Sequence, residues 1–149
     1  MSYVIDTDIL ARSVEASHPM QPVAVDTVEV LISRGETVCV MPQNLYEFWV
    51  VATRPRDRNG LGLSAVEAQG YLTQFERIFT LLPDVPAIYA EWKRLVGQHV
   101  VMGKNAHDAR IVAAMKVHGI SHLVTFNGDD FKRFQGIITV VEPKREEGI

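Results

Sequence analysis

Carboxylates are the side chains in this sequence whose spacing points to chemistry. They are dispersed along the chain, at Asp6, Glu47, Asp108, Asp129 and Asp130. If folding gathered several of them, repulsion and desolvation would force some to stay protonated unless a divalent cation neutralised them. Ligand sets made only of oxygen suit Mg²⁺ and Mn²⁺. The pattern therefore predicts a magnesium or manganese site, provided that the fold brings these acids together.

The other metal-binding side chains do not indicate zinc. The histidines are scattered without ligand spacing, at His18, His99, His107, His118 and His122. Even His107, beside Asp108, is expected to be a surface or capping residue. The single cysteine, Cys39, lies in an apolar run and is expected to be buried, so it can form neither a disulfide nor a thiolate cluster.

Apolar runs and helix signals alternate almost throughout the sequence. The runs predicted as strands are 2–5, 37–40, 78–82, 121–126 and 137–141. Helices are predicted after Asp6 and over 22–33, from Pro42 to the break at Pro55, and over 64–76, 87–99, 105–118 and 129–134. Ser64 and Glu67 have the spacing of a capping box. This order predicts an α/β fold with a mainly parallel sheet and helices on both faces.

Parallel strands offer one place where the acids can meet. In open α/β sheets, functional groups collect beyond the carboxyl ends of the strands. Asp6 directly follows the first predicted strand, and Glu47 lies in the opening turns of the helix after the second. Asp108 lies near the start of the helix that leads into the fourth strand, and Asp129 and Asp130 follow that strand. We therefore expect convergence, although the aspartates can also cap helices and Glu47 can point to solvent.

Five segments resemble the PIN domains of bacterial toxin–antitoxin systems, the VapC-type toxins. In order, these segments are YVIDTDIL, MPQNLYEFWVVATRP, NGLGLS, HDARIVAAM and LVTFNGDDFKRFQGI. The resemblance covers most of the chain. It implies a three-layer α/β/α sandwich, metal-dependent endoribonuclease activity on RNA, inhibition by a cognate antitoxin and homodimer formation.

The resemblance also assigns site residues. Asp6, Glu47 and Asp108 match the first three acids of the family. Many members place an aspartate where this chain has Asn127, so the fourth position lies among Asn127, Asp129 and Asp130, with Asp130 preferred.

A second departure from the family is Asp8, where relatives often have asparagine. Asp8 either makes the pocket more acidic or replaces that amide.

Metal-assisted hydrolysis follows from these assignments. Asp6 and Asp108 are expected to bind the metal directly, and Glu47 either binds it or acts as base on the attacking water. Asp130 or Asn127 would complete a second site or hold a water, and the Thr125 hydroxyl would orient these groups. Whether one or two ions bind is left open, as is the RNA target.

Length, composition and net charge limit the number of domains, the location and the type of partner that we expect. The chain has 149 residues, of which 47% are hydrophobic, which fits one domain, expected over 1–142, followed by a polar tail over 143–149. No apolar run is long enough to cross a membrane and no signal peptide is indicated, so a cytoplasmic location is expected. A net charge of −3 argues against a surface that coats nucleic acid.

Local basic residues are the remaining candidates for nucleic-acid contact. Arg54, Arg56 and Arg58, in a turn-rich stretch, either contact RNA phosphates or form a solvated loop.

Two other functions compete with the nuclease. DTD and GDD after strands resemble haloacid-dehalogenase phosphatases, with Asp6 as nucleophile and Asp8 as acid, but that mechanism leaves Glu47 and Asp108 unused. Asn127 also allows a catalytically inactive PIN-like domain that binds RNA or protein.

A partner surface is a further expectation. The aromatic side chains Tyr46, Phe48 and Trp49 exceed what one inward helical face needs. They either line a groove for an antitoxin helix or a dimer contact, or pack in the core.

Overall fold

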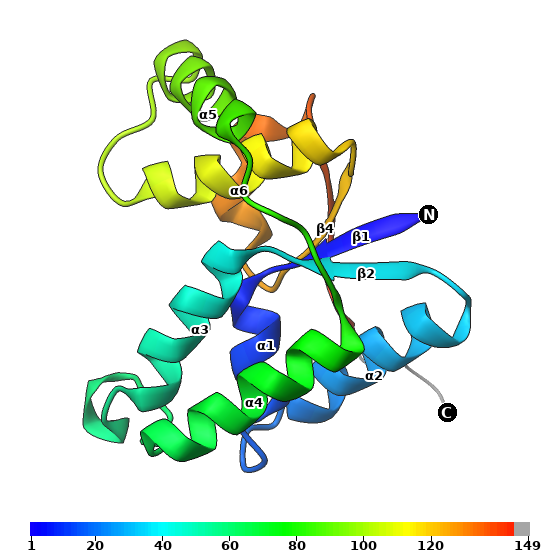
Figure 1. The fold of residues 1–149 in the computed structure, drawn as a ribbon, viewed down its shortest axis with the longest axis vertical. Coiled ribbons are helices and arrows are strands. Elements are labelled where there is room, and N and C mark those ends of the chain that lie inside the picture. The colour runs from blue at the N-terminus through cyan, green and yellow to red at the C-terminus, as the bar shows by residue number, and fades with distance from the viewer. Residues whose placement is uncertain (145–149) are drawn as a thin grey trace.

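A five-stranded parallel sheet runs through the middle of the computed structural model, which describes residues 1–144 (Figure 1). The strands are β1 (Ser2–Ile5), β2 (Thr37–Val40), β3 (Thr80–Leu81), β4 (His122–Val124) and β5 (Thr139–Val141). The order across the sheet is β3-β2-β1-β4-β5. The first strand is therefore the central one, and the chain builds outward to one side of it before crossing to the other.

Helices cover both faces of the sheet. They are α1 (Thr7–Ser13), α2 (Gln21–Ser33), α3 (Pro42–Thr53), α4 (Ala65–Ile78), α5 (Pro86–Gln98) and α6 (Asn105–His118), with 3₁₀ helices η1 (Arg56–Arg58) and η2 (Gly128–Phe134). In Figure 1, α1 to α4 lie on one side of the sheet and α5 and α6 on the other. The predicted three-layer α/β/α sandwich is confirmed.

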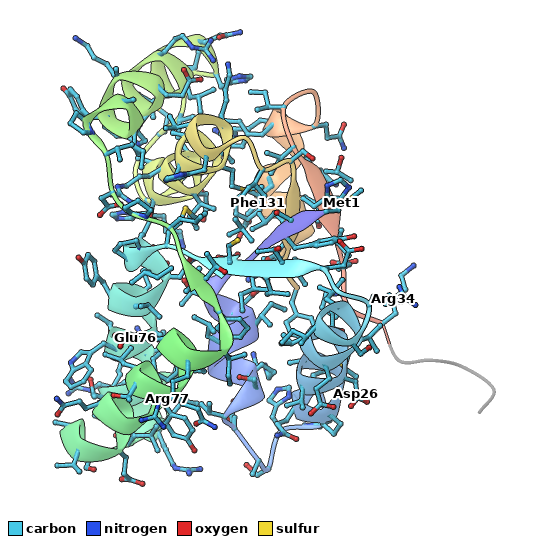
Figure 2. All side chains as sticks on the ribbon, turned by 45° about the vertical axis from the view of Figure 1, so that its right-hand side comes forward. Met1, Asp26, Arg34, Glu76, Arg77 and Phe131 are labelled. Atoms are coloured by element: carbon cyan, nitrogen blue, oxygen red, sulfur yellow. The ribbon has the colours of Figure 1, made fainter. Side chains whose placement is uncertain are left out.

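Alternation along the strands divides the core into two layers. Val4 of β1 packs with α5, α6 and η2, whereas the next residue, Ile5, packs with the layer of α1 to α4. Neighbouring strand residues point to opposite faces, so each buried strand contributes to both layers. Phe131 of η2, only 1% exposed, lies beside the sheet in the first layer (Figure 2). Cys39 is buried and free, as expected.

The ends of several elements differ from the prediction. Strand 78–82 shortens to β3 because α4 continues to Ile78. Strand 137–141 shortens to β5 because the N–H groups of Ile137 and Ile138 donate to the Phe134 carbonyl in a turn. The capping box is present: the Ser64 hydroxyl accepts from the Glu67 N–H at 3.1 Å, and Glu67 accepts from the Ser64 N–H at 3.0 Å.

Two further expectations concern the C-terminal tail and membrane-spanning helices. Residues 145–149 of the expected 143–149 tail lie outside the part of the chain that the structure describes. Within residues 1–144, no helix has the length and apolar character needed to cross a membrane.

Gly60 closes the turn between α3 and α4, and the close approach there predicts its sensitivity to substitution. A Cβ at Gly60 would lie 1.8 Å from the Arg54 carbonyl oxygen. Gly60→Ala is expected to lower the free energy of unfolding by about 1–3 kcal/mol, as overpacking does. Urea denaturation measures this. The control is Gly70→Ala in α4, where an added Cβ meets nothing within 4 Å and better helix propensity should leave stability unchanged or raised. Equal stability of the two variants would contradict the packing argument.

Candidate active site

The candidate site lies at the carboxyl ends of β1 and β4, where the order of strands reverses. Asp6 follows β1 and is the N-cap of α1, and its main-chain N–H donates to the Val124 carbonyl at 2.9 Å. Its side chain is buried, with Oδ1 accepting from the Thr7 N–H at 2.8 Å and Oδ2 from the Thr125 hydroxyl at 2.9 Å. Such a switch point is where ligands bind in open α/β sheets. Asp6 therefore caps α1 and also lies at the switch point between β1 and β4.

Asp8 is held more tightly than expected for a supporting residue. Its Oδ2 accepts from the Thr125 hydroxyl at 3.1 Å, the Phe126 N–H at 3.0 Å and the Asn127 side-chain amide at 3.0 Å. Its Oδ1 is buried without a hydrogen-bond partner. Burial, followed by the charge of Asp6, raises the pKa of Asp8 to about 7. Asp8 therefore adds to the site a half-buried carboxylate with one buried, unpartnered oxygen.

Glu47 is fixed through both of its carboxylate oxygens. Oε2 accepts from the Thr7 hydroxyl at 3.1 Å, and Oε1 accepts from the Gln43 amide at 2.7 Å. Gln43 and Glu47 are four residues apart on α3 and so share one helix face. The side chain is half-buried and points toward the acids rather than to open solvent. Phe48, the next residue, is fully buried in the core.

Asp108 lies in the first turn of α6 and is half-buried. Burial, together with the charges of Asp6, Asp130 and Glu47, raises its pKa to about 6. The pKa of Asp6 is also raised to about 6, because burial and the charges of Glu47 and Asp130 outweigh the hydrogen bonds from Thr125 and Thr7. Because the charges of Asp6, Glu47 and Asp130 all raise the pKa of Asp108, the structure brings these four acids to one region.

The three candidates for the fourth position differ in their surroundings. Asn127 donates its amide to Asp8, and its main-chain N–H donates to the Thr125 hydroxyl at 3.0 Å. Asp129 is exposed and forms an ion pair with Lys132 at 3.1 Å. Asp130 is also exposed, but its charge raises the pKa of both Asp6 and Asp108. Electrostatics therefore favour Asp130.

The donor set fits a hard divalent cation in its chemistry. It consists of carboxylate oxygens whose protonation is favoured by burial and mutual repulsion, with one buried oxygen of Asp8 unpartnered. No ion pair between residues 1 and 144 involves Asp6, Asp8, Glu47, Asp108 or Asp130. No group of three His, Cys, Asp or Glu side chains in those residues is placed to hold a metal ion. The carboxylates would have to approach one another more closely to do so.

The arginine-rich loop is not part of the acidic cluster. Arg54, Arg56 and Arg58 follow α3 at the end remote from the sheet (Figure 1). Arg54 lies seven residues after Glu47, which is about 10 Å along a helix axis. Its guanidinium donates to the Asn59 carbonyl at 3.0 Å. Their contact with RNA stays a prediction.

Several polar residues at the site were not singled out from the sequence. Thr7 and Gln43 hold Glu47, Arg110 donates to Gln43 at 3.0 Å, and the buried Asn44 donates to the Thr7 hydroxyl at 3.4 Å. The spacing of Gln43 and Glu47 on one helix face was the available signal for Gln43. Arg110 gave no such signal because its contacts are with distant parts of the sequence.

The fold and site together define a three-layer α/β/α protein with carboxylates at its central switch point. A profile of the PIN domain family matches residues 3–137, so this chain belongs to the PIN domain family. PIN domains are typically nucleases and generally use divalent metals. No curated protein matches the chain in sequence.

Solved structures of toxin–antitoxin proteins have the same fold. The chain is similar to VapBC2 from Rickettsia felis bound to a promoter DNA fragment, with a TM-score of 0.71, 16% identity and coverage of 97% of this chain and 100% of that one. It is similar to VapC20 of Mycobacterium tuberculosis, described as a toxin that cleaves the sarcin-ricin loop, with a TM-score of 0.67, 18% identity and coverage of 95% and 99%. A toxin–antitoxin complex from Klebsiella pneumoniae has a TM-score of 0.64, 18% identity and coverage of 97% and 99%. The predicted resemblance to PIN domains of the VapC type is confirmed.

The raised pKa values predict how stability depends on pH when metal is absent. The pKa values of Asp6 and Asp108 are raised from 3.8 to about 6, and that of Asp8 to about 7. Between pH 4 and 7 the folded protein therefore binds more protons than the unfolded chain, so the free energy of unfolding falls as pH rises. The melting temperature in EDTA should be lower at pH 8 than at pH 5.

Asp8→Asn is the matched variant for this measurement. The side-chain carbonyl oxygen of the asparagine can accept the hydrogen bonds that Asp8 Oδ2 accepts, while the substitution removes the carboxylate charge. We expect the variant to be more stable than the unsubstituted protein at pH 8, with a shallower dependence on pH. A melting temperature that is constant or rises from pH 5 to 8 in the unsubstituted protein would contradict the argument.

Proposed function

We propose that this chain is a metal-dependent endoribonuclease toxin that hydrolyses phosphodiester bonds of RNA and is neutralised by a cognate antitoxin. The observation that carries the proposal is the electrostatic coupling of Asp6, Glu47, Asp108 and Asp130 at the switch point of a PIN fold. Between residues 1 and 144, no arginine or lysine forms an ion pair with these acids, so their negative charge is available to a bound cation.

The proposed roles follow from the surroundings of each acid. Mg²⁺ or Mn²⁺, when bound, would supply the positive charge that lowers the pKa of an attacking water and offsets charge on the phosphate. Asp6 and Asp108 would hold the ion, with Asp130 as the fourth acid. Glu47, fixed by Gln43 and Thr7, would either bind the ion or accept the proton of the water.

Thr125 would hold the carboxylates of Asp6 and Asp8 in fixed positions relative to each other during the reaction. Its hydroxyl lies within hydrogen-bond distance of one oxygen of each, and the Asn127 N–H donates to that hydroxyl in turn. Since the hydroxyl carries one proton, it can donate to one carboxylate at a time. The second carboxylate is left with excess charge available to a cation.

The phosphatase alternative fits the structure less well. It requires Asp8 as a general acid, but three donors from the segment after β4 hold its Oδ2. It also requires a lysine after a middle strand, whereas Met41, Leu82 and Thr125 directly follow β2, β3 and β4. Mapping of RNA cut sites in cells distinguishes an inactive PIN-like domain from a nuclease.

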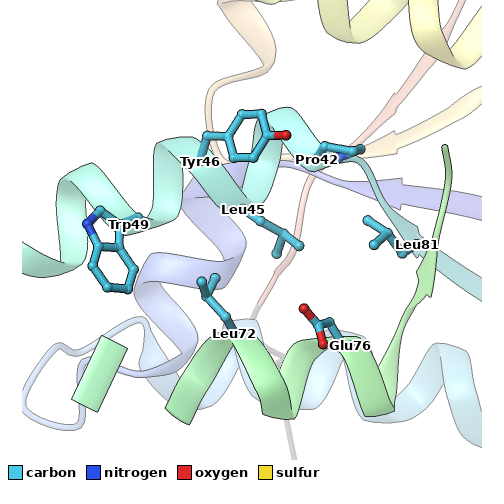
Figure 3. Close-up of a pocket in the computed structure, with 7 residues that line it drawn as sticks. All are labelled: Pro42, Leu45, Tyr46, Trp49, Leu72, Glu76 and Leu81. Carbon is cyan, nitrogen blue, oxygen red and sulfur yellow. The ribbon is translucent and has the colours of Figure 1, made fainter. Parts of the chain in front are cut away.

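A shallow apolar groove supports the proposal of a protein partner. The groove has a volume of about 480 Å³ and lies between α3, α4 and β3 (Figure 3). It is lined by Pro42, Leu45, Tyr46, Trp49, Leu72, Glu76 and Leu81. Of the aromatic residues Tyr46, Phe48 and Trp49, Tyr46 is 68% exposed and Trp49 lines the groove, whereas Phe48 is buried in the core. An apolar antitoxin segment is the proposed occupant, and a second copy of the chain is the competing one.

RNA cleavage in cells tests the activity directly. Cut sites are mapped by sequencing RNA ends after brief expression of the chain and of Asp108→Asn. We expect new ends with the unsubstituted chain and at least about a hundredfold fewer with the variant.

Asp26→Asn is the matched control, because Asp26 is an exposed aspartate (Figure 2) on α2, a helix that carries none of the candidate acids. It should cut RNA like the unsubstituted chain. The same RNA ends at the same frequency in Asp108→Asn would rule out this active site.

Metal binding is tested by thermal stability. A cation that binds the folded carboxylates alone stabilises the fold, and at a hundredfold excess over Kd the gain is about 2.7 kcal/mol, or roughly 5–10 °C. We expect Mn²⁺ to raise the melting temperature at pH 8 and to do so less at pH 5, where protons compete for Asp6 and Asp108.

Asp108→Asn should reduce the Mn²⁺ effect at pH 8, and Asp26→Asn should preserve it. An equal shift at both pH values in all three proteins would show that the ion binds elsewhere.

A further inference from the structure

We propose that Gln43 is a positioning residue that sets Glu47 against the Asp108 helix, and that Arg110 fixes the orientation of its amide. The inference rests on the proposed nuclease function and adds two residues to the machinery of that site. It is carried by a continuous set of hydrogen bonds that runs from the surface at Asp84 to the carboxylate of Glu47.

Gln43 uses both of its amide N–H groups and one acceptor site of its carbonyl oxygen in this position. Its side chain is 7% exposed. Nε2 donates to Glu47 Oε1 at 2.7 Å and to the His107 carbonyl at 2.8 Å, while Oε1 accepts from Arg110 at 3.0 Å. A carboxamide offers two N–H groups in the amide plane, and both have partners here. One planar group therefore links α3 to α6.

The link determines the spacing between two acids. His107 immediately precedes Asp108, so the bond to the His107 carbonyl holds the first turn of α6 beside Glu47. The other oxygen of Glu47 is held by Thr7, which lies between Asp6 and Asp8. Glu47 is thus held from α6 on one side and from α1 on the other. Groups that orient reacting carboxylates in this way control the geometry of a metal site.

Arg110 reinforces the orientation of the Gln43 amide that directs its nitrogen to Glu47. A guanidinium can only donate, so the atom of Gln43 that faces Arg110 must be oxygen. The amide nitrogen is then directed to Glu47. A flipped amide would place its oxygen against a carboxylate oxygen and its N–H₂ against the guanidinium, and both contacts would be repulsive. Arg110 therefore acts on Glu47 through Gln43.

Asp84 holds Arg110 in the required place. Arg110 Nη2 lies 3.0 Å from Asp84 Oδ1, with side chains that are 33% and 40% exposed. A partly exposed ion pair of this kind contributes little to stability. Its effect is orientational: one nitrogen of the guanidinium binds Asp84 and the other is presented to Gln43.

A double-mutant cycle tests the proposal. Gln43→Met removes the amide at similar volume, Arg110→Met removes the orienting donor at a half-buried position, and a third variant carries both changes. The measurements are kcat and KM for RNA cleavage in Mn²⁺ and the Kd of Mn²⁺ by calorimetry. We expect Gln43→Met to lower kcat by about tenfold or more and to weaken Mn²⁺ binding. KM should change by less than about twofold, because neither residue is proposed to contact RNA.

The double variant decides whether Arg110 acts through Gln43. We expect Arg110→Met alone to have a smaller effect of the same kind and the double variant to match Gln43→Met within about twofold. Arg110→Lys, which keeps a donor, should recover most of the lost kcat. Effects that multiply in the double variant, or an Arg110→Met defect confined to KM, would overturn the proposal and indicate a direct phosphate contact.

Matched controls and a spectroscopic readout keep the test independent of activity. Gln74→Met and Arg77→Met make the same changes at exposed positions of α4 and should leave all values unchanged. The side-chain amide resonances of Gln43, assigned by their loss in Gln43→Met, should shift and exchange faster with solvent in Arg110→Met. Unchanged resonances in Arg110→Met would overturn the orienting role.

Failure of the wider function gives a different result. If the unsubstituted chain cleaves no RNA, the proposed nuclease activity fails. The Mn²⁺ affinities and the amide resonances then still decide whether Gln43 and Arg110 order the acids.

Discussion

Two carboxylates compete for one proton at the centre of this structure, and the character of the site depends on that competition. The Thr125 hydroxyl lies 2.9 Å from Asp6 Oδ2 and 3.1 Å from Asp8 Oδ2. Main-chain N–H groups of Thr7 and Phe126 supply one further bond each. These donors hold the two acids in place but do not neutralise them, and burial raises the pKa of each despite the hydrogen bonds. The structure holds negative charge in place without compensating it.

The same principle extends to the other acids. Glu47 is held by an amide and a hydroxyl, both neutral groups. The arginine closest in this network, Arg110, is directed to Gln43 and Asp84 rather than to Glu47. Direct pairing with the guanidinium would satisfy the carboxylate and lower its affinity for another cation. Neutral donors next to the acids and charged groups one contact further away are therefore a consistent arrangement for a cation site.

The layout of the fold and the positions of the acids could be predicted because both depend on local pattern. Asp6 follows a strand in the sequence and must lie at its carboxyl end, and the same reasoning places Glu47 and Asp108 near that edge. The bonds from Gln43 to His107 and from Arg110 to Gln43 could not be predicted, since they depend on side-chain directions across segments 64 or more residues apart. Short strands were also overestimated: apolar residues such as Ile78 belong to helices that pack on the sheet. The hydrogen bonds of Asp8 could not be predicted because its three donors come from a segment that is distant in sequence.

The central position of β1 has a consequence for synthesis of the protein on the ribosome. β1 is made before both of its neighbours, and one of them, β4, is completed only at Val124. Asp6 therefore meets Thr125 only after the 118 residues between them have been translated. A nascent chain that extends past Asp108 but not yet to β4 carries three of the acids, Asp6, Glu47 and Asp108, without the strand that aligns them. The order of strands delays assembly of the site until β4 has been translated and can pair with β1.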